Sequence, residues 1–367
     1  MRAPSAVVVA AAVASAALAA LAACGTPARS AEGPPPARAF YYWRTTFRLA
    51  PAEAAALTEL GISRLYVRAF DVAWSAVEAA PSMIGKLVPA GPDAAARVPA
   101  GIEVVPVVFL REEVLRHTAQ RTVGLAADIW AEVGRRMQLL GATPRELQLD
   151  CDWTDTTQEA FFDLARELRR VAGLPLGATI RLHQIKYRER TGVPPVERGM
   201  LMFYNMGPFS ADPEARAIFD PASAARYLAR VAEYPLPLDV ALPIWSWTLH
   251  LRDDRVIGLL QSTDPDELAA QPFLVRAAPD RYVAAESAFL HGAMIRQGDV
   301  LKIEVTGPAE ALAAARQIAP HLPPSPANPP PSTPANPPRT VALFDLSERN
   351  LARHAPATLD QVFRAVR

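Results

Sequence analysis

The chain has 367 residues, two cysteines, and 38 basic and 38 acidic side chains, so its formal net charge is zero. The balanced charge argues against nucleic acid as a partner, because nucleic-acid-binding domains concentrate positive charge. The length suits one large domain, or one domain that carries an insertion.

The first segment carries an export signal. Arg2 provides a positive start, and residues 6–23 form a run of small and apolar side chains with Ser15 as its only polar member. A charged start, an apolar run and small residues before the cleavage point are typical of a secretory signal peptide. We therefore expect a signal peptide at 1–23. The run ends in Leu21-Ala22-Ala23-Cys24, which resembles the lipobox of bacterial lipoproteins; the alternative is an ordinary signal peptide that happens to contain a cysteine.

The lipobox resemblance implies that Cys24 is lipidated, with a diacylglycerol thioether and an amide-linked acyl chain such as palmitate, since stable anchoring needs more than one chain. It implies an exported, membrane-anchored lipoprotein of the bacterial cell envelope. Residues 24–38 are rich in Pro, Ala and Gly, and we expect a disordered tether there. Cys151 is then the only free cysteine, so the exported fold must depend on its hydrophobic core.

Eight short apolar runs recur after the tether, most of them separated by segments of helical periodicity. Several are nearly continuous in Val, Ile and Leu, as strands buried on both faces are. The runs are Phe40–Trp43, Arg64–Val72, Glu103–Leu110, Glu146–Trp153, Leu176–His183, Gly199–Met206, Leu238–Trp247 and Thr340–Leu346. The clearest helical segments are Pro51–Leu60, Val123–Leu140, Thr156–Val171 and Ala222–Glu233. This alternation predicts a (β/α)8 TIM-type barrel over residues 39–367.

Residues 249–338 are too many for one barrel connection, and we expect an insertion between strands seven and eight. It contains apolar pieces of its own, Val300–Val305 and the helical Ala309–Ile318. Val300–Val305 competes with Thr340–Leu346 for the role of the eighth strand. Residues 321–339 form a Pro-rich tract that predicts an exposed, extended loop.

The predicted fourth strand ends in two aspartates. Side chains two apart share one face of a strand, so Gln148, Asp150 and Asp152 should point into the barrel while the apolar residues between them face the helices. Two inward carboxylates are costly unless paired or used, and like charges at this spacing raise one pKa, as in acids tuned for proton transfer. We take Asp150 and Asp152 as candidate catalytic residues; the alternative is that they are buried partners of Arg68 and Arg181.

Other strand ends bring aromatic and polar side chains to the same rim. Aromatic rings stack on the apolar faces of sugars, and polar groups bind the hydroxyls. This favours a glycan ligand, although each Trp alone would suit core packing. The candidate ligand-binding residues are Trp43, Arg68, Arg181, His183, Tyr204, Asn205, Trp245 and Trp247.

Sequence blocks between Phe40 and Trp247 resemble a family of uncharacterised bacterial proteins that carry a domain of unknown function. The blocks are Phe40-Tyr41-Tyr42-Trp43, Gln148 to Thr154, Arg181-Leu182-His183-Gln184, Gly199 to Met206, and Leu242-Pro243. The family brings no settled activity.

A remoter resemblance is to the chitinase-like barrels of glycoside hydrolase family eighteen. Asp150 and Asp152 match the last two aspartates of their strand four, and Trp153 matches the following Trp, but Thr154 stands where those enzymes have their catalytic Glu. Met202-Phe203-Tyr204-Asn205 matches their strand six motif with Asn for Asp. Since threonine cannot protonate a leaving oxygen, the resemblance implies the fold and a sugar-like ligand more than that reaction.

These residues are compatible with three alternative functions. The first is hydrolysis of a glycan or related envelope polymer, with Asp152 as the acid, oriented by Asp150; Asp155 is another possible acid. The second is a carbohydrate-binding or scaffold lipoprotein without catalysis. The third, a metal hydrolase using Asp150, Asp152 and His183, is the weakest, because the sequence has no closely spaced histidine pair. We expect neither metal nor cofactor.

Overall fold

The computed structural model describes residues 35–118, 122–261, 263–323 and 338–366. The predicted signal peptide, Cys24, most of the tether and residues 324–337 of the Pro-rich loop lie outside the described residues. Within the described ranges, no helix has both the length and the apolar character that crossing a bilayer requires.

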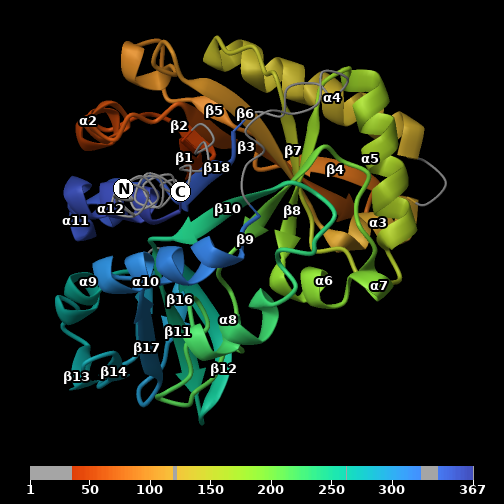
Figure 1. Ribbon diagram of the computed structural model, residues 1–367. Helices are drawn as coiled ribbons and strands as arrows, with labels where there is room; N and C mark the ends of the chain where they lie inside the picture. Colours follow the sequence, from red (N-terminus) through yellow and green to blue (C-terminus); the bar gives the residue numbers. More distant parts are fainter. Residues whose placement is uncertain (1–34, 119–121, 262, 324–337, 367) are drawn as a thin grey trace, which may run out of the picture.

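Eight parallel strands close into a barrel, which confirms the predicted (β/α)8 fold (Figure 1). Their order around the barrel follows the chain, and the last strand pairs with the first over Ala37–Phe40 and Thr340–Leu343. The strands are β1 (Ala37–Tyr42), β3 (Arg64–Ser75), β6 (Glu103–Leu110), β7 (Leu147–Asp150), β8 (Leu176–Arg181), β9 (Arg198–Met202), β10 (Leu238–Pro243) and β18 (Thr340–Phe344).

Helices cover the outside of the barrel (Figure 1). They are α2 (Pro51–Glu59), α3 (Glu112–Thr118), α4 (Thr122–Leu140), α5 (Gln158–Ala172), α6 (Leu182–Lys186), α7 (Arg188–Thr191), α8 (Pro221–Leu228), α10 (Pro308–Ile318), α11 (Glu348–Arg353) and α12 (Pro356–Ala365). The longest, α4 and α5, bury apolar stripes against the strands. Trp153 belongs to this outer packing, because its ring stacks on Phe161 of α5 at 4.7 Å.

No α-helix connects β3 to β6. There β3 turns back into the antiparallel strand β4 (Ala80–Ile84), followed by the short β5 (Val88–Pro89), which pairs with β2 (Thr46–Phe47), and one 3-10 turn (Ala94–Ala96). The prolines and glycines of this stretch explain the missing helix, since both residue types disfavour helix interiors.

The floor of the barrel, at the N-terminal ends of the strands, is filled by buried ion pairs. Arg64 bonds Glu103 at 3.0 Å and Glu146 at 3.3 Å, and Arg198 pairs with Asp239 at 2.8 Å. These pairs close the interior from below, so the open end lies at the C-terminal ends of the strands.

The segment in which an insertion is expected contains a five-stranded antiparallel sheet with a small core of its own, below the barrel in Figure 1. Its strands are β11 (Ser246–Arg252), β12 (Arg255–Gln261), β13 (Leu274–Ala278), β14 (Arg281–Ala284) and β17 (Val300–Val305), with α9 (Pro265–Ala269) and the hairpin β15 (Ala288–Leu290) and β16 (Ala293–Ile295) beside them. Val300–Val305 therefore belongs to this sheet, and Thr340–Phe344 is the eighth barrel strand.

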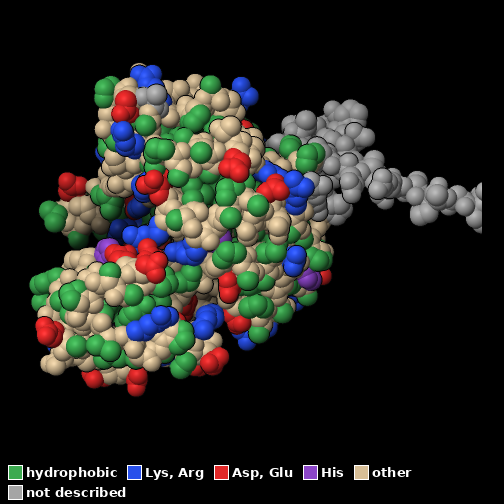
Figure 2. All heavy atoms as spheres, turned by 90° about the vertical axis from the view of Figure 1, so that its left-hand side faces the viewer, with side chains coloured by type: hydrophobic (Ala, Val, Ile, Leu, Met, Phe, Trp, Pro, Cys, Tyr) green, Lys and Arg blue, Asp and Glu red, His purple; other side chains and the backbone are tan. Residues whose placement is uncertain are grey.

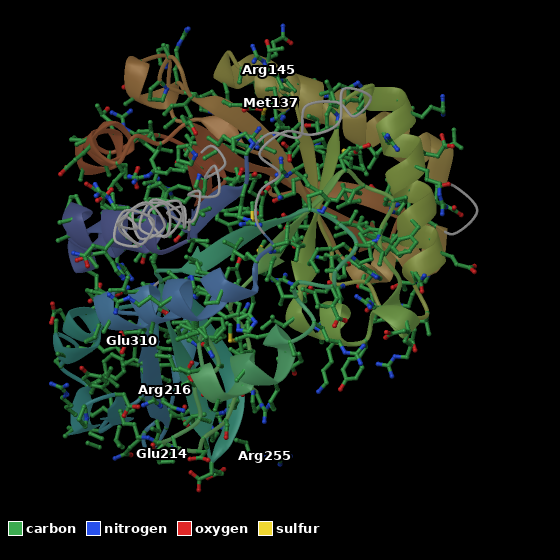
Figure 3. The ribbon with its side chains drawn as sticks, in the orientation of Figure 1. Met137, Arg145, Glu214, Arg216, Arg255 and Glu310 are labelled. Atoms are coloured by element: carbon green, nitrogen blue, oxygen red, sulfur yellow. The ribbon has the colours of Figure 1, made fainter. Side chains whose placement is uncertain are left out.

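The barrel and this sheet meet along a charged notch. Figure 2 shows side chains of both signs gathered in the hollow between the two lobes. Arg349 of α11 bonds Glu267 of α9 at 2.9 Å and lies 3.4 Å from Asp264. Elsewhere on this junction, Arg216 and Glu310, labelled in Figure 3, line a small cavity of about 360 Å³ where α10 meets the sheet.

Candidate functional site

A cavity of about 490 Å³ opens at the barrel mouth. Seven of the eight barrel strands supply a lining residue at or after their C-terminal ends, as TIM-barrel sites are built, and β3 supplies Arg68 and Asp71 from within the strand. The inserted sheet adds the wall nearest to it. The lining residues are Trp43, Arg44, Arg68, Asp71, Phe109, Arg111, Asp150, Arg181, Tyr204, Asn205, Trp245, Ser246, Trp247, Gln261, Phe344 and Asp345.

Asp150, the last residue of β7, points into this cavity, where strand alternation predicts it. Gln148 also faces inward, since its Oε1 accepts a hydrogen bond from the Tyr41 hydroxyl at 2.6 Å. The Asp150 carboxylate is almost fully enclosed: it accepts a hydrogen bond from Thr179 at 2.7 Å and lies 3.5 Å from Arg181. Burial raises the pKa of Asp150, and the Arg181 guanidinium opposes the shift.

Asp152 does not line the barrel interior, so that part of the prediction is wrong. The strand ends at Asp150, and the alternation of faces does not continue into the loop that follows. The Asp152 side chain is 57% exposed, and its carboxylate accepts a hydrogen bond from Arg181 Nε at 2.5 Å. Arg181 therefore bridges both candidate catalytic carboxylates.

A second cavity of about 450 Å³ adjoins the first. Arg181, Tyr204 and Asn205 line both cavities, while Asp152 and His183 line only the second. His183 was expected on the inner face of strand five, but β8 ends at Arg181 and His183 lies in the first turn of α6. Partial burial lowers the pKa of His183.

Thr154 also lines the second cavity, and a network of side chains surrounds it. Its hydroxyl donates to Glu112 Oε1 at 2.9 Å, and its backbone N–H donates to the Thr157 hydroxyl at 2.9 Å. The position that holds the acid in chitinase-like barrels is thus occupied by a neutral side chain bonded to a carboxylate from α3.

Aromatic rings form one side of the main cavity. Phe344 is central: its ring lies 5.3 Å from that of Trp43, 5.2 Å from that of Trp245 and 5.7 Å from that of Tyr204. Trp245 lies 6.2 Å from Trp247. Trp43, Trp245 and Trp247 are therefore brought together, as the sequence predicts.

Trp247 is placed by the inserted sheet rather than by strand seven. The predicted strand Leu238–Trp247 is two strands, β10 and β11, and the break follows Pro243, the last residue of β10. The indole N–H of Trp247 donates to Glu304 Oε2 at 3.2 Å, and this same oxygen accepts the backbone N–H of Ala217 at 2.9 Å. Phe209, from the loop after β9, packs edge-on against Trp247 at 5.1 Å.

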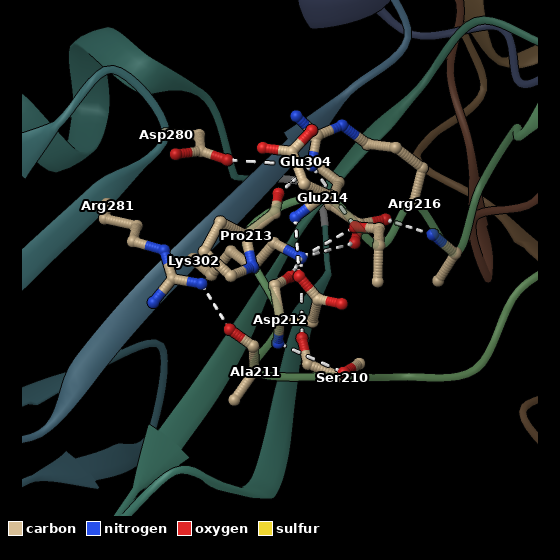
Figure 4. A network of polar contacts seen from close by, with 12 residues as sticks. Ser210, Ala211, Asp212, Pro213, Glu214, Arg216, Asp280, Arg281, Lys302 and Glu304 are labelled. Atoms are coloured by element: carbon tan, nitrogen blue, oxygen red, sulfur yellow. Dashed lines mark hydrogen bonds and ion pairs between the residues drawn. The ribbon is translucent and has the colours of Figure 1, made fainter.

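A buried lysine holds the loop that carries Phe209 (Figure 4). Lys302 of β17 has no exposed surface, and its ammonium group donates to the backbone carbonyls of Asp212 and Ala215, each at 2.7 Å. Glu304 Oε1 lies 3.6 Å from the Lys302 ammonium group. The Lys302–Glu304 pair therefore couples the inserted sheet to the loop beside the cavity.

Two acidic cavity residues escape the sequence prediction. Asp71 forms a bidentate pair with Arg68, at 2.7 and 2.5 Å. Simple alternation would put residues three apart on opposite faces, but a register shift between Arg68 and Phe70 brings both to the cavity. Asp345 follows β18, and its carboxylate accepts the side-chain N–H of Asn350 at 2.6 Å. Burial raises the pKa of Asp345 to about 6.

The geometry does not favour a metal site. Within residues 35–118, 122–261, 263–323 and 338–366, no group of three or more His, Cys, Asp or Glu side chains is arranged to hold an ion. Asp150, Asp152 and His183 do not converge on one point, and Arg181 occupies the space between the two carboxylates.

No family model matches the chain, and no curated protein matches it in sequence. Membership of the family of uncharacterised bacterial proteins therefore stays an expectation from the sequence blocks.

Solved structures similar to the chain include the spore cortex-lytic enzyme SleL of Bacillus cereus, at 9% identity and a TM-score of 0.53 over 91% of this chain and 74% of that one. The SleL enzyme of Bacillus megaterium QM B1551 is 10% identical, with a TM-score of 0.51 and coverage of 92% and 75%. The chitinase-like agglutinin RobpsCRA from Robinia pseudoacacia is 12% identical, with a TM-score of 0.51 and coverage of 90% and 99%. At these identities the similarity shows the fold alone, and it supports the resemblance to chitinase-like barrels at that level.

Proposed function

We propose that this protein is an exported lipoprotein that binds a glycan in the cavity at its barrel mouth. The observation that carries this proposal is the composition of that cavity: Trp43, Trp245 and Trp247 line it together with several charged and amide side chains. Aromatic faces suit the C–H faces of sugar rings, and the polar groups suit their hydroxyls. A volume of about 490 Å³ lies within the range of small-ligand sites.

Binding is favoured over the acid catalysis first expected from Asp152. The Asp152 carboxylate is held by the Arg181 guanidinium at 2.5 Å, and Asp152 does not line the main cavity at the barrel mouth. Thr154 supplies no acid either. The similar structures include a chitinase-like agglutinin as well as lytic enzymes, so this fold also occurs in a protein that is named for agglutination.

The lipid anchor at Cys24 remains part of the proposal, and it is supported by the lipobox resemblance. Mass spectrometry of the mature N-terminus tests it separately from ligand binding. An N-terminal residue upstream of position 24, or an unmodified cysteine, would contradict the anchor and leave the glycan proposal intact.

Binding itself can be tested by calorimetry with cellopentaose, chitopentaose and solubilised peptidoglycan strands. We expect one of these glycans to bind, and Trp245→Ala to weaken that binding because the ring lines the cavity. Trp130→Ala is the matched control, since Trp130 lies on the outer helix α4 and lines neither mouth cavity. Failure of all three glycans to bind, or equal effects of the two substitutions, would contradict the proposed function.

A further inference from the structure

The three aspartates of the main cavity are not in equivalent settings. Asp71 is held by both nitrogens of the Arg68 fork, and Asp150 is bonded by Thr179 and faces Arg181. Asp345 differs, because no Lys, Arg or His of the described residues lies within ion-pairing distance of its carboxylate. It is thus the cavity aspartate that is best placed to carry a proton.

The surroundings of Asp345 orient its carboxyl group. Asn350 of α11, itself buried, uses its side-chain amide to contact both Asp345 Oδ1 at 2.6 Å and the Asp345 backbone carbonyl at 2.9 Å. Oδ2 accepts no side-chain hydrogen bond within the part of the chain that the structure describes. One carboxyl oxygen is therefore fixed, and the other is left for a bound molecule.

The charged groups around Asp345 leave its carboxyl group suited to donate a proton. The titratable groups that face it are Arg44 after β1, Glu53 of α2 and Tyr204 after β9. Arg44 is held by Glu53 through two contacts of 2.8 Å, which weakens its pull on Asp345. Burial therefore prevails, and it raises the pKa of Asp345 to about 6. An acid with such a pKa is protonated in about a tenth of the molecules at pH 7 and in about half of them at pH 6.

We propose that Asp345 is the general acid of a glycoside hydrolase reaction in this cavity. The inference rests on the proposed glycan binding and adds an activity to it. Asp345 gives its proton to the oxygen of the glycosidic bond as the bond from that oxygen to the anomeric carbon breaks. A water molecule forms the new bond to the anomeric carbon, and its proton passes to the carboxylate of Asp150, which Arg181 faces at 3.5 Å. The products are two sugar hydroxyl compounds, and proton exchange with solvent restores both aspartates.

The test compares Asp345→Asn with the unmodified protein on whichever of cellopentaose, chitopentaose or peptidoglycan strands binds. Reducing-end release measures turnover, and calorimetry measures binding. Asparagine keeps the shape and still accepts the Asn350 bond, so we expect affinity within about threefold and at least a 100-fold loss of kcat, in line with the loss of a general acid. Asp253→Asn, in the exposed β11–β12 turn, is the matched control and should keep full turnover.

Two further readouts separate an acid from a structural residue. The kcat/KM of the unmodified protein should fall as pH rises above about 6, because the acid must be protonated. The second readout uses a dinitrophenyl glycoside of the bound sugar, whose leaving group needs no proton. Asp345→Asn should lose much less kcat on this substrate than on the oligosaccharide, each compared with the unmodified protein. A structural role would reduce both reactions alike.

The outcomes distinguish this inference from the function on which it rests. A glycan that binds but is never cleaved overturns the role of Asp345 and leaves the binding function standing. Turnover that survives Asp345→Asn also overturns it. A panel in which nothing binds overturns the proposed function itself.

Discussion

Replacing Lys302 by Met tests whether the buried pair on β17 holds the cavity wall together. The substitution preserves most of the side-chain volume but removes the ammonium group. Two good charge-assisted hydrogen bonds are lost, to the carbonyls of Asp212 and Ala215, and Glu304 is left buried without its cation. The carbonyl of Ser210, at 3.4 Å, is too distant to count as a strong partner.

The magnitude follows from these contacts. Removing one member of a buried ion pair costs about 3–5 kcal/mol, mostly because the remaining charge is uncompensated. Relief from burying the ammonium group offsets part of this, so we expect Lys302→Met to lower the free energy of unfolding by about 3–4 kcal/mol. Glu304→Gln keeps an acceptor for the backbone N–H of Ala217 and should cost less, about 1–2 kcal/mol.

Urea unfolding of the two single variants and the double variant measures the coupling. The double variant has no uncompensated charge, so it should be more stable than the sum of the single effects predicts, by about 0.5–3 kcal/mol. Lys86→Met is the matched control, because Lys86 is 43% exposed and its loss should change stability by less than about 0.5 kcal/mol. Strict additivity of Lys302→Met and Glu304→Gln would refute the coupling argument.

Three other outcomes are expected. Trp247→Ala should weaken glycan binding roughly two- to tenfold in calorimetry, since a lost aromatic contact is worth about 0.5–1.5 kcal/mol; unchanged affinity would remove Trp247 from the ligand site. Burial raises the pKa of Glu146 to about 7, above its value of about 4.3 in the unfolded chain. The folded state therefore favours the protonated side chain, so the stabilisation from Glu146 is complete at low pH and is lost as the pH rises through 7. Thermal unfolding of Glu146→Gln at pH 5 and pH 8 should therefore show a smaller pH dependence than the unmodified protein, and an equal dependence would count against this assignment. Cys24→Ser should abolish lipid attachment, which metabolic labelling with a fatty acid would detect, and persistent labelling would exclude that cysteine.

The barrel could be predicted because its strands carry their own signal. Runs such as Glu103–Leu110 are apolar on both faces, as strands of a buried parallel sheet are, and β6 has those same bounds. Alternation of faces also holds along β7, which is why Gln148 and Asp150 both lie inside. Within a regular strand, the predicted directions of the side chains therefore agree with the structure.

The errors fall where strands end or bulge. Asp152 and His183 were assigned by extending the alternation by two residues, past the last hydrogen-bonded position of β7 and β8. Asp71 was missed because a bulge in β3 reverses the expected face. Asp345 was missed because its environment depends on Asn350 and on Arg44, about 300 residues away in sequence. The alternation of side chains along one strand does not show where the strand ends, where it bulges, or which distant residues it contacts.

Arg181 explains why the sequence pattern of a chitinase-like strand four does not carry the same chemistry here. Its guanidinium bonds Asp152 at 2.5 Å and lies 3.5 Å from Asp150, so one cation contacts the carboxyl groups of both aspartates. Burial raises the pKa of Asp150, and the Arg181 guanidinium opposes that shift, so the cation favours Asp150 as an acceptor of a proton over a donor. Any acid must then come from a strand that Arg181 does not reach. Asp345, which lines the main cavity and has no ion-pair partner among the described residues, meets that condition.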